Sequence, residues 1–139
     1  MKMIDITIDH IKISVPEGTT ILQAARQVGV DIPTLCYHPD HKVRATCRVC
    51  LVEVKGSKKL ETACSTPVWE GMEIVTSSKE AREARKMVLE LILANHPQDC
   101  LQCVRNGSCE LQKLTREFGR DKISLASAVE RLPLDNSNP

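Results

Sequence analysis

The sequence has very few aromatic residues: Tyr37, Trp69 and Phe118 are the only three among 139 residues. A hydrophobic core therefore has to be built from Ile, Val, Leu and Ala, and modest cores of this kind are often reinforced by a bound metal. The chain also lacks an excess of either charge, because 19 Lys and Arg nearly balance 18 Asp and Glu. A net charge of +1 with interspersed signs argues against nucleic-acid binding, which needs a basic face.

Long apolar runs are missing as well, and none approaches the ~20 residues that a membrane-spanning helix requires. The N-terminus alternates apolar and polar residues from Met3 to Val15 and does not have the pattern of a signal peptide. We therefore expect a cytoplasmic, reducing location. Seven cysteines, an odd number, then argue against a disulfide framework and favour thiolate chemistry or metal binding.

The first half of the chain predicts strands around one helix. Alternation of apolar and polar residues on both sides of positions 9–10 indicates a β-hairpin over residues 3–15. Thr20 and Gln23 have the spacing of a capping box, which predicts a short helix ending near Val28. Further strands are predicted at residues 51–55, 59–63 and 73–76. Together these elements indicate a small mixed sheet.

The second half changes to helical periodicity. A capping box at Ser77 and Glu80 predicts the start of a helix that ends near Asn95. Apolar residues recur at i, i+3, i+4 and i+7, which predicts a buried face made of Ala84, Met87, Val88 and Leu91. A cysteine-bearing loop follows, and a second helix is predicted from about residue 108, with an apolar face of Leu111, Leu114 and Phe118. The expected fold class is therefore α+β.

The first group of cysteines lies in the strand-rich half and has four members: Cys36, Cys47, Cys50 and Cys64. Four thiols are enough for one tetrahedral zinc ion, or for a 2Fe-2S cluster with two thiolates on each iron. Within the stretch CRVC, Arg48 and Val49 are interpreted as residues that only span the gap between two adjacent ligands.

The second group has three members, Cys100, Cys103 and Cys109, and so lacks a fourth ligand. His96 stands four residues before Cys100, at the predicted end of a helix. Seven cysteines and this histidine make two complete sets of four, which accounts for the odd cysteine count. A histidine at the C-terminus of a helix also interacts favourably with the helix dipole, so His96 alone is a weak indication.

Several alternatives remain at this point. Cysteines can fill a core as small apolar residues, but these seven lie mostly in predicted loops. Cys47 and Cys50 alone could be a thioredoxin-like redox pair. Zinc accepts four cysteines as well as three cysteines with one histidine. The first group does not have the doubled CxxC spacing of a zinc ribbon, so spacing favours an iron-sulfur cluster and leaves zinc as the competitor.

The residues themselves resemble a known family. The stretches TLCYHPDHKVRATCRVCLVEV and ACSTPVWEGM resemble the N-terminal 2Fe-2S domain of complex I-type large iron-sulfur subunits and of iron-only hydrogenases. The stretch LELILANHPQDCLQCVRNGSCELQKL is similar to the 4Fe-4S segment that follows this domain in the same proteins. The resemblance implies one 2Fe-2S cluster on Cys36, Cys47, Cys50 and Cys64. It implies one 4Fe-4S cluster on His96, Cys100, Cys103 and Cys109, and it favours iron over zinc.

The resemblance also implies an organisation. We expect a β-grasp, ferredoxin-like 2Fe-2S domain at residues 1–77, a small helical 4Fe-4S domain at 78–120, and a tail or linker at 121–139. Members of the family continue into further cluster domains and then an H-cluster or molybdopterin-type domain, and LPLDNSNP resembles the linker before these. Residues for hydrogen activation, formate oxidation or nucleotide binding are missing from the sequence, so no catalytic residue is predicted.

The implied function is electron transfer. The chain is expected to be an iron-sulfur subunit, or its N-terminal part, of a multisubunit flavin oxidoreductase linked to NAD(P)H or ferredoxin, such as a bifurcating hydrogenase or a transhydrogenase. A large subunit of the complex I or formate dehydrogenase type is the alternative, and a zinc-stapled interaction module without a redox role is the remote one. The expected partners are flavin- and NAD(P)-binding subunits and other iron-sulfur subunits, with a ferredoxin as a further candidate.

Overall fold

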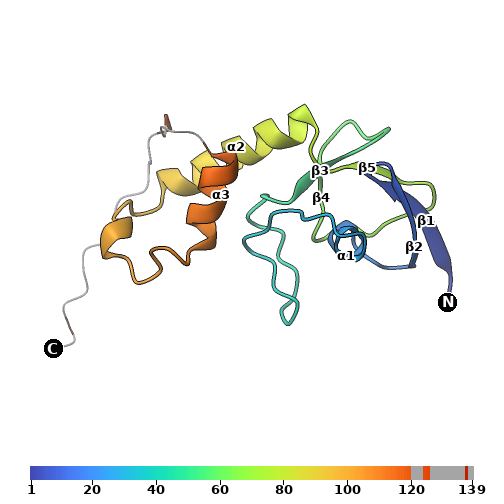
Figure 1. The fold of residues 1–139 in the computed structure, drawn as a ribbon, viewed down its shortest axis with the longest axis horizontal. Coiled ribbons are helices and arrows are strands. Elements are labelled where there is room, and N and C mark those ends of the chain that lie inside the picture. The colour runs from blue at the N-terminus through green and yellow to red at the C-terminus, as the bar shows by residue number, and fades with distance from the viewer. Residues whose placement is uncertain (120–123, 126–136, 138–139) are drawn as a thin grey trace.

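Figure 1 shows a computed structural model of the chain, which describes residues 1–119, 124–125 and 137. A sheet with one short helix forms one side of the molecule, and a long helix with a second helix alongside it forms the other. The predicted tail at 121–139 lies outside the described residues, apart from positions 124, 125 and 137. Among the helices that the structure describes, none combines the length and apolar character needed to cross a membrane.

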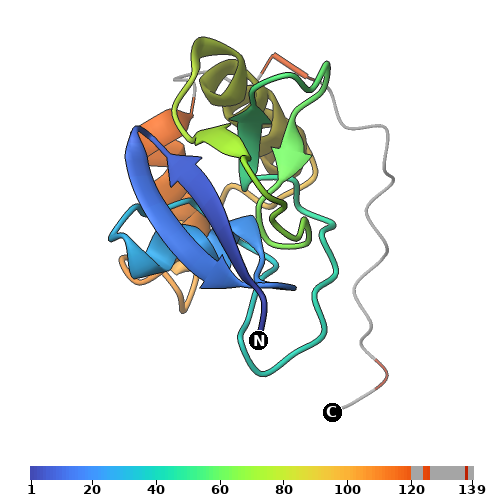
Figure 2. The ribbon, with the colours of Figure 1, turned by 90° about the vertical axis from the view of Figure 1, so that its right-hand side faces the viewer.

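The predicted N-terminal hairpin is confirmed. Strands β1 (Met3–Ile8) and β2 (Ile11–Pro16) pair antiparallel in an unbroken register, and Figure 2 shows this hairpin in front of the helices. Asp9 and His10 form the turn with φ values of 45° and 72°, the left-handed conformation that a two-residue hairpin turn requires. The hairpin contributes to the core through Ile4, Ile6, Ile8 and Val15.

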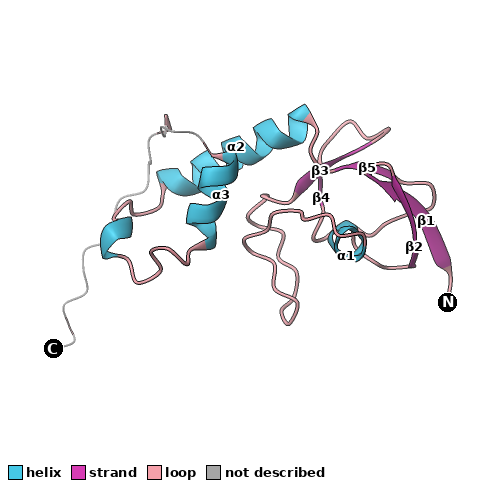
Figure 3. Ribbon diagram, in the orientation of Figure 1, coloured by secondary structure: helices cyan, strands magenta, loops and turns pink. Residues whose placement is uncertain are grey.

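Three further strands complete a mixed sheet with the order β2-β1-β5-β3-β4. They are β3 (Leu51–Val54), β4 (Glu61–Thr62) and β5 (Glu73–Val75), and β5 pairs parallel with β1 while the other neighbours pair antiparallel. The strand predicted at 59–63 is therefore present but shorter. Figure 3 shows that long loops connect these strands, and the first group of cysteines lies in or beside those loops.

Helix α1 (Ile21–Gln27) packs against the sheet and closes the first core. Its capping box is confirmed: the Gln23 backbone N–H donates to the Thr20 hydroxyl at 3.3 Å, and the Thr20 N–H donates to the Gln23 side chain at 3.0 Å. The helix contributes its fully buried side chains to this core: Ile21, Leu22, Ala24 and Ala25. A mixed sheet with one helix packed on it is the β-grasp arrangement that was expected.

The helical part contains α2 (Lys79–Ala94), a short 3-10 turn η1 (Cys100–Gln102) and α3 (Glu110–Phe118). The predicted cap of α2 was wrong by one residue, because the Ser78 hydroxyl, and not that of Ser77, accepts the N–H of Ala81 at 3.2 Å. With Ser78 as the cap, Glu80 occupies the second helical position. The capping box needs its acidic side chain at the third position, so the predicted Ser77–Glu80 pair cannot form it.

The predicted buried face of α2 was wrong at two of its four positions; the other two, Ala84 and Val88, are partly buried, and Val88 packs with Leu89 and Leu114. Met87 and Leu91 are 46% and 52% exposed, and the fully buried positions are Ala81, Arg85, Leu89 and Glu90. The pattern failed because Arg85, a charged residue, lies in the centre of the face that α2 turns toward β3 and α3. The predicted face of α3 is confirmed, since Leu114 is buried and Leu111 and Phe118 pack around it.

Two candidate iron-sulfur sites

The four cysteines of the first group meet beside β3. Cys50 directly precedes this strand and Cys64 follows β4 after one intervening residue, Ala63, so the antiparallel pairing of the two strands brings the two cysteines together. The Ala63 N–H donates to the Cys50 carbonyl at 3.1 Å and extends this pairing to the ligand positions. Cys36 and Cys47 lie on the long loop before β3 and are half-buried, whereas Cys50 and Cys64 are each 1% exposed.

These thiols form two pairs. Cys36 lies beside Cys47 and Cys50 lies beside Cys64, so that the two thiols of each pair affect each other's pKa. A tetrahedral zinc site needs four ligands at one point, whereas a 2Fe-2S cluster takes two thiolates on each of two irons. Two adjacent pairs therefore fit the binuclear cluster.

The protonation of the four thiols is interdependent. Burial raises the pKa of Cys36, but hydrogen bonds from the backbone and side chain of Cys47 and from Thr46 outweigh it and lower the pKa to about 7. Burial, followed by the negative charges of Cys50, Cys36 and Cys47, raises the pKa of Cys64 to about 12. The Cys36 thiolate therefore forms easily near neutral pH, whereas Cys47 and Cys64, whose pKa values are raised, resist ionisation. Positively charged iron relieves this repulsion, so cluster binding releases protons.

Backbone N–H groups point at the sulfur atoms of the loop. Burial raises the pKa of Cys47, and the nearby N–H groups of Val49, Cys36 and Leu35 partly offset this rise. The loop can aim its amides inward because Ala45 and Arg48 adopt φ values of 51° and 61°, left-handed conformations that non-glycine residues rarely take. Such concave arrangements of N–H groups stabilise anions and iron-sulfur centres. Sequence analysis missed this role, and nothing in the residue types of Ala45 and Arg48 signals it.

Val49 is more than a spacer, which corrects the interpretation of CRVC. Its side chain is fully buried between Leu89 of α2 and Leu114 of α3 and forms the centre of a second hydrophobic core. Leu35 and Cys47, also from the ligand loop, pack against the same core. The loop that carries the first group of cysteines therefore supplies part of the core that holds the two helices together.

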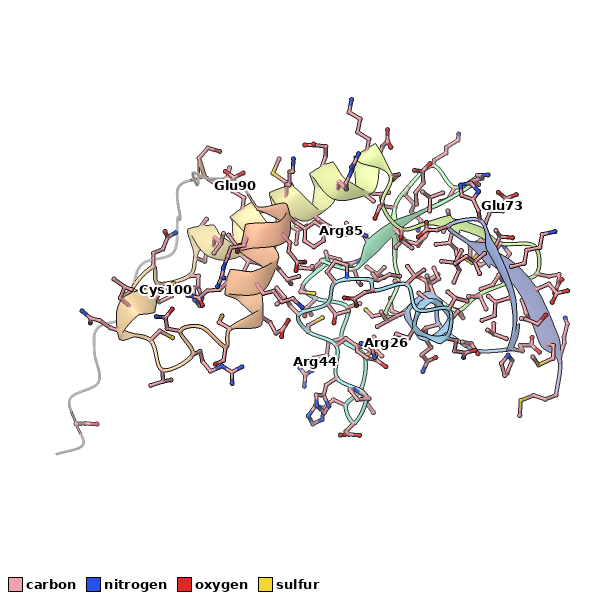
Figure 4. All side chains as sticks on the ribbon, viewed as in Figure 1. Arg26, Arg44, Glu73, Arg85, Glu90 and Cys100 are labelled. Carbon is pink, nitrogen blue, oxygen red and sulfur yellow. The ribbon has the colours of Figure 1, made fainter. Side chains whose placement is uncertain are left out.

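The second group lies at the far end of the helical part, where Figure 4 labels Cys100. An open cavity of about 910 Å³ is lined by all four predicted ligands: His96, Cys100, Cys103 and Cys109. His96 follows the last turn of α2, where its N–H bonds to the Leu93 carbonyl at 3.1 Å, and Cys109 is the residue that caps α3. The turn η1 joins the other two, because the Cys103 N–H donates to the Cys100 carbonyl at 3.1 Å.

Helix α3 holds the loop of this second site in place. The Gln112 side chain accepts the N–H of Gly107 at 3.0 Å and donates to the Asn106 side chain at 2.9 Å. Gly107 has a φ of +83°, a conformation in which any larger residue would be strained. Sequence analysis did not single out Gln112, because a glutamine on an exposed helix face gives no signal of such a role.

The donor set of the second site fits a 4Fe-4S cluster. The four side chains line a common cavity. A cubane cluster takes one protein ligand at each of four separate irons, so its ligands surround a volume. Sulfur and imidazole nitrogen are both established donors to iron in such clusters.

Comparison with known protein families agrees with this geometry. Residues 1–79 match the family described as the 2Fe-2S iron-sulfur cluster binding domain, and residues 85–124 match the NADH-ubiquinone oxidoreductase-G iron-sulfur binding region. The first match covers more than half of the chain, so the protein belongs to the 2Fe-2S cluster binding domain family. Together the two regions carry one 2Fe-2S and one 4Fe-4S cluster.

Two curated relatives illustrate where this pair of regions occurs. The chain is 49% identical over 124 residues to the NADP-reducing hydrogenase subunit HndD of Solidesulfovibrio fructosivorans, which covers 86% of the chain and 21% of that protein. It is 43% identical over 120 residues to the NADH-ubiquinone oxidoreductase 75 kDa subunit of Reclinomonas americana, which covers 86% of the chain and 17% of that protein. The chain thus spans about a fifth of the length of these relatives.

A solved structure shares the arrangement of the whole chain. The crystal structure of an NAD+-reducing NiFe hydrogenase in the H2-reduced state matches with a TM-score of 0.85 at 30% identity, over 98% of this chain and 57% of that one. The resemblance inferred from the sequence, the α+β fold with a ferredoxin-like 2Fe-2S domain, and the two cluster types are thereby confirmed. The assignment of individual ligands stays a prediction.

Proposed function

We propose that the chain is an electron relay, an iron-sulfur part of a larger NAD(P)-linked oxidoreductase that passes single electrons between two clusters. The observation that carries this proposal is the presence of two separate donor sets on one continuously packed chain. Iron-thiolate clusters exchange one electron with little change in geometry. The chain's own contribution is to hold the two sites at a fixed separation and to shield the first of them, since Cys50 and Cys64 are buried.

For the first site we propose that Cys36 and Cys47 bind one iron and that Cys50 and Cys64 bind the other. Support comes from the two pairs of neighbouring thiols, which have this partition. For the second site we propose one ligand per iron, from the four side chains that line its cavity: His96, Cys100, Cys103 and Cys109.

The proposed organisation is a 2Fe-2S domain at residues 1–77, a helical 4Fe-4S domain at 78–120 and a tail or linker at 121–139. The two family matches, which fall on residues 1–79 and 85–124, support the first two parts. The proposed partners are flavin- and NAD(P)-binding and iron-sulfur subunits of a cytoplasmic complex, with a ferredoxin as a further electron partner. A net charge of +1 suits a stably docked subunit, because mobile electron carriers tend to use strong charge for steering.

A hydrogenase-type assembly is favoured by the hydrogenase subunit that is 49% identical and by the hydrogenase structure that matches the whole chain. A complex I-type assembly is the second candidate, because a 75 kDa subunit of an NADH-ubiquinone oxidoreductase is 43% identical.

The proposal predicts that the anaerobically purified chain is brown, with visible absorption that bleaches on addition of dithionite. Reduced protein is expected to give two distinct EPR signals, one from each cluster, because the two donor sets are separate. If the protein is colourless and metal analysis finds zinc and no iron, the electron-relay proposal is contradicted and the zinc-stapled interaction module is supported.

Histidine ligation predicts a raised potential at the second site. A neutral imidazole in place of a thiolate removes one negative charge, which makes reduction easier, as in Rieske centres. His96→Cys is therefore expected to retain the cluster and to lower its reduction potential, as measured by protein-film voltammetry. His41→Cys, a change at an exposed loop histidine near the first site, is the control and should leave this potential unchanged. An unaltered potential in His96→Cys would count against His96 as a ligand.

A further inference from the structure

Arg85 is a buried cation in the middle of α2. Its side chain is 1% exposed, and Figure 4 shows it where α2 faces β3. The guanidinium donates to the Leu51 carbonyl at 2.9 Å and to the Thr76 carbonyl at 2.5 Å, and its carbon lies 5.7 Å from the centre of the Phe118 ring. These contacts from β3, the β5–α2 connection and α3 fix the charge in place and keep it from reaching solvent.

Within the described part of the chain, this buried charge forms no salt bridge with a carboxylate. Among the same residues, the Nε of Arg85 is a buried donor without an acceptor. Burial lowers the pKa of Arg85, which reflects the cost of the uncompensated charge. A buried cation is tolerated when an opposite charge stands nearby, so the surroundings of Arg85 indicate what that charge is.

Two acidic groups raise the pKa of Arg85 against the effect of burial, and Cys50 raises it more than Asp9 does. The Asp9 carboxylate is already engaged, because it accepts the Thr76 N–H at 2.8 Å and the Thr76 hydroxyl. Cys50 is buried and adjoins Leu51, whose carbonyl binds the guanidinium. Arg85 therefore faces two negative groups, the Asp9 carboxylate and the first group of thiols, and of these only the thiol site gains charge when a cluster bound there is reduced.

We propose that Arg85 supplies the buried counter-charge of the 2Fe-2S site and thereby raises the reduction potential of the cluster bound there. This inference rests on the proposed function, because it takes Cys50 and its three companions as the cluster ligands. A cluster held by four thiolates is an anion, and reduction adds one further negative charge. A fixed cation in a poorly solvated site stabilises the reduced form more than the oxidised form. Arg85 is not itself a ligand in this proposal; its positive charge affects the cluster electrostatically from beside the ligand Cys50.

The test uses the full chain with both clusters and an EPR-monitored redox titration. Arg85→Met keeps the apolar stem and removes the charge, and such replacement of a buried charge by an apolar side chain is commonly tolerated. Arg85→Gln keeps an N–H donor without the charge, and Arg85→Lys keeps the charge. In the Met and Gln variants we expect about a tenfold smaller ratio of reduced to oxidised 2Fe-2S cluster at a given solution potential. For a one-electron couple this is a shift of about 59 mV to lower potential.

The controls separate charge from packing. Arg85→Lys should stay close to the wild-type potential, and Phe118→Leu, which removes the ring beside the guanidinium and leaves the charge, should lower stability without moving the potential. The 4Fe-4S signal should titrate unchanged in all four variants. If Met and Gln lower the melting temperature but leave the 2Fe-2S potential at the wild-type value, Arg85 is a structural tie and the inference is overturned. If the wild type shows no 2Fe-2S signal, the proposed function fails instead.

Discussion

Replacing Cys50 with alanine is expected to abolish the 2Fe-2S EPR signal and leave the signal of the helical cluster in place. Cys50 is buried within the first thiol set, and each of the four thiols is needed for a cluster with two thiolates on each iron. The second set lies on a different loop, around its own cavity. Iron analysis should fall from about six to about four atoms per chain, and EPR of the dithionite-reduced protein should show which signal remains.

Arg48→Asn is the matched control for Cys50→Ala. Arg48 is exposed, lies inside the same CRVC stretch, and has the left-handed conformation that asparagine adopts more readily than most residues. Both clusters should survive this change. Loss of both EPR signals in Cys50→Ala would show that the sites do not assemble independently, and it would contradict the separation of the two donor sets.

Val49→Asp is expected to affect both clusters and the stability of the whole chain, unlike Cys50→Ala, because it damages the core that the ligand loop shares with α2 and α3. A carboxylate at this fully buried position is surrounded by Leu89 and Leu114, and an unpaired charge in such a place is strongly destabilising. The free energy of unfolding should fall by more than about 4 kcal/mol, the range of the most severe single substitutions. Denaturant unfolding of the cluster-loaded protein measures the loss, and both clusters should be incorporated poorly.

Val43→Asp provides the comparison for this prediction. Val43 lies on the same loop and is 43% exposed, so the same substitution should change the free energy of unfolding by less than about 0.5 kcal/mol. Val49→Ala should lie between the two, at about 2 kcal/mol, since it leaves a cavity without introducing a charge. If Val49→Asp removes only the 2Fe-2S signal, the helical part would be stable without the loop, against the shared core described above.

Local rules predicted much of the fold. The hairpin, its turn at Asp9 and His10, and the Thr20 cap depend on residues that are adjacent in sequence, so their pattern is visible there. Met87 and Leu91 were wrongly predicted to lie on the buried face of α2, because Arg85, a charged residue, takes a core position through contacts with β3 and Phe118. Such tertiary contacts leave no periodic signal in the sequence.

The candidate sites also contain residues that could be predicted from the sequence and residues that could not. The eight predicted ligands follow from cysteine counting and from one histidine at a helix end, and the structure brings each set of four together. The groups around them were not predictable. Ala45 and Arg48 turn the loop amides toward sulfur through backbone conformation, and Val49 packs into a core formed by residues about 40 to 70 positions away.

The length of α2 sets the spacing between the two sites. Of its 16 residues, those from Arg85 to Ala94 lie between the two sites, and they span about 14 Å at the helical rise per residue. Arg85 fastens the helix to the sheet beside the first site, and the last turn leads directly into His96 at the second. Substitutions on the exposed face of α2, at Met87 for example, leave this spacing untouched. Inserting one residue between Arg85 and His96 would instead rotate the second site by about 100° around the helix axis. The number of residues in this part of α2 therefore sets both the distance between the two sites and their relative orientation.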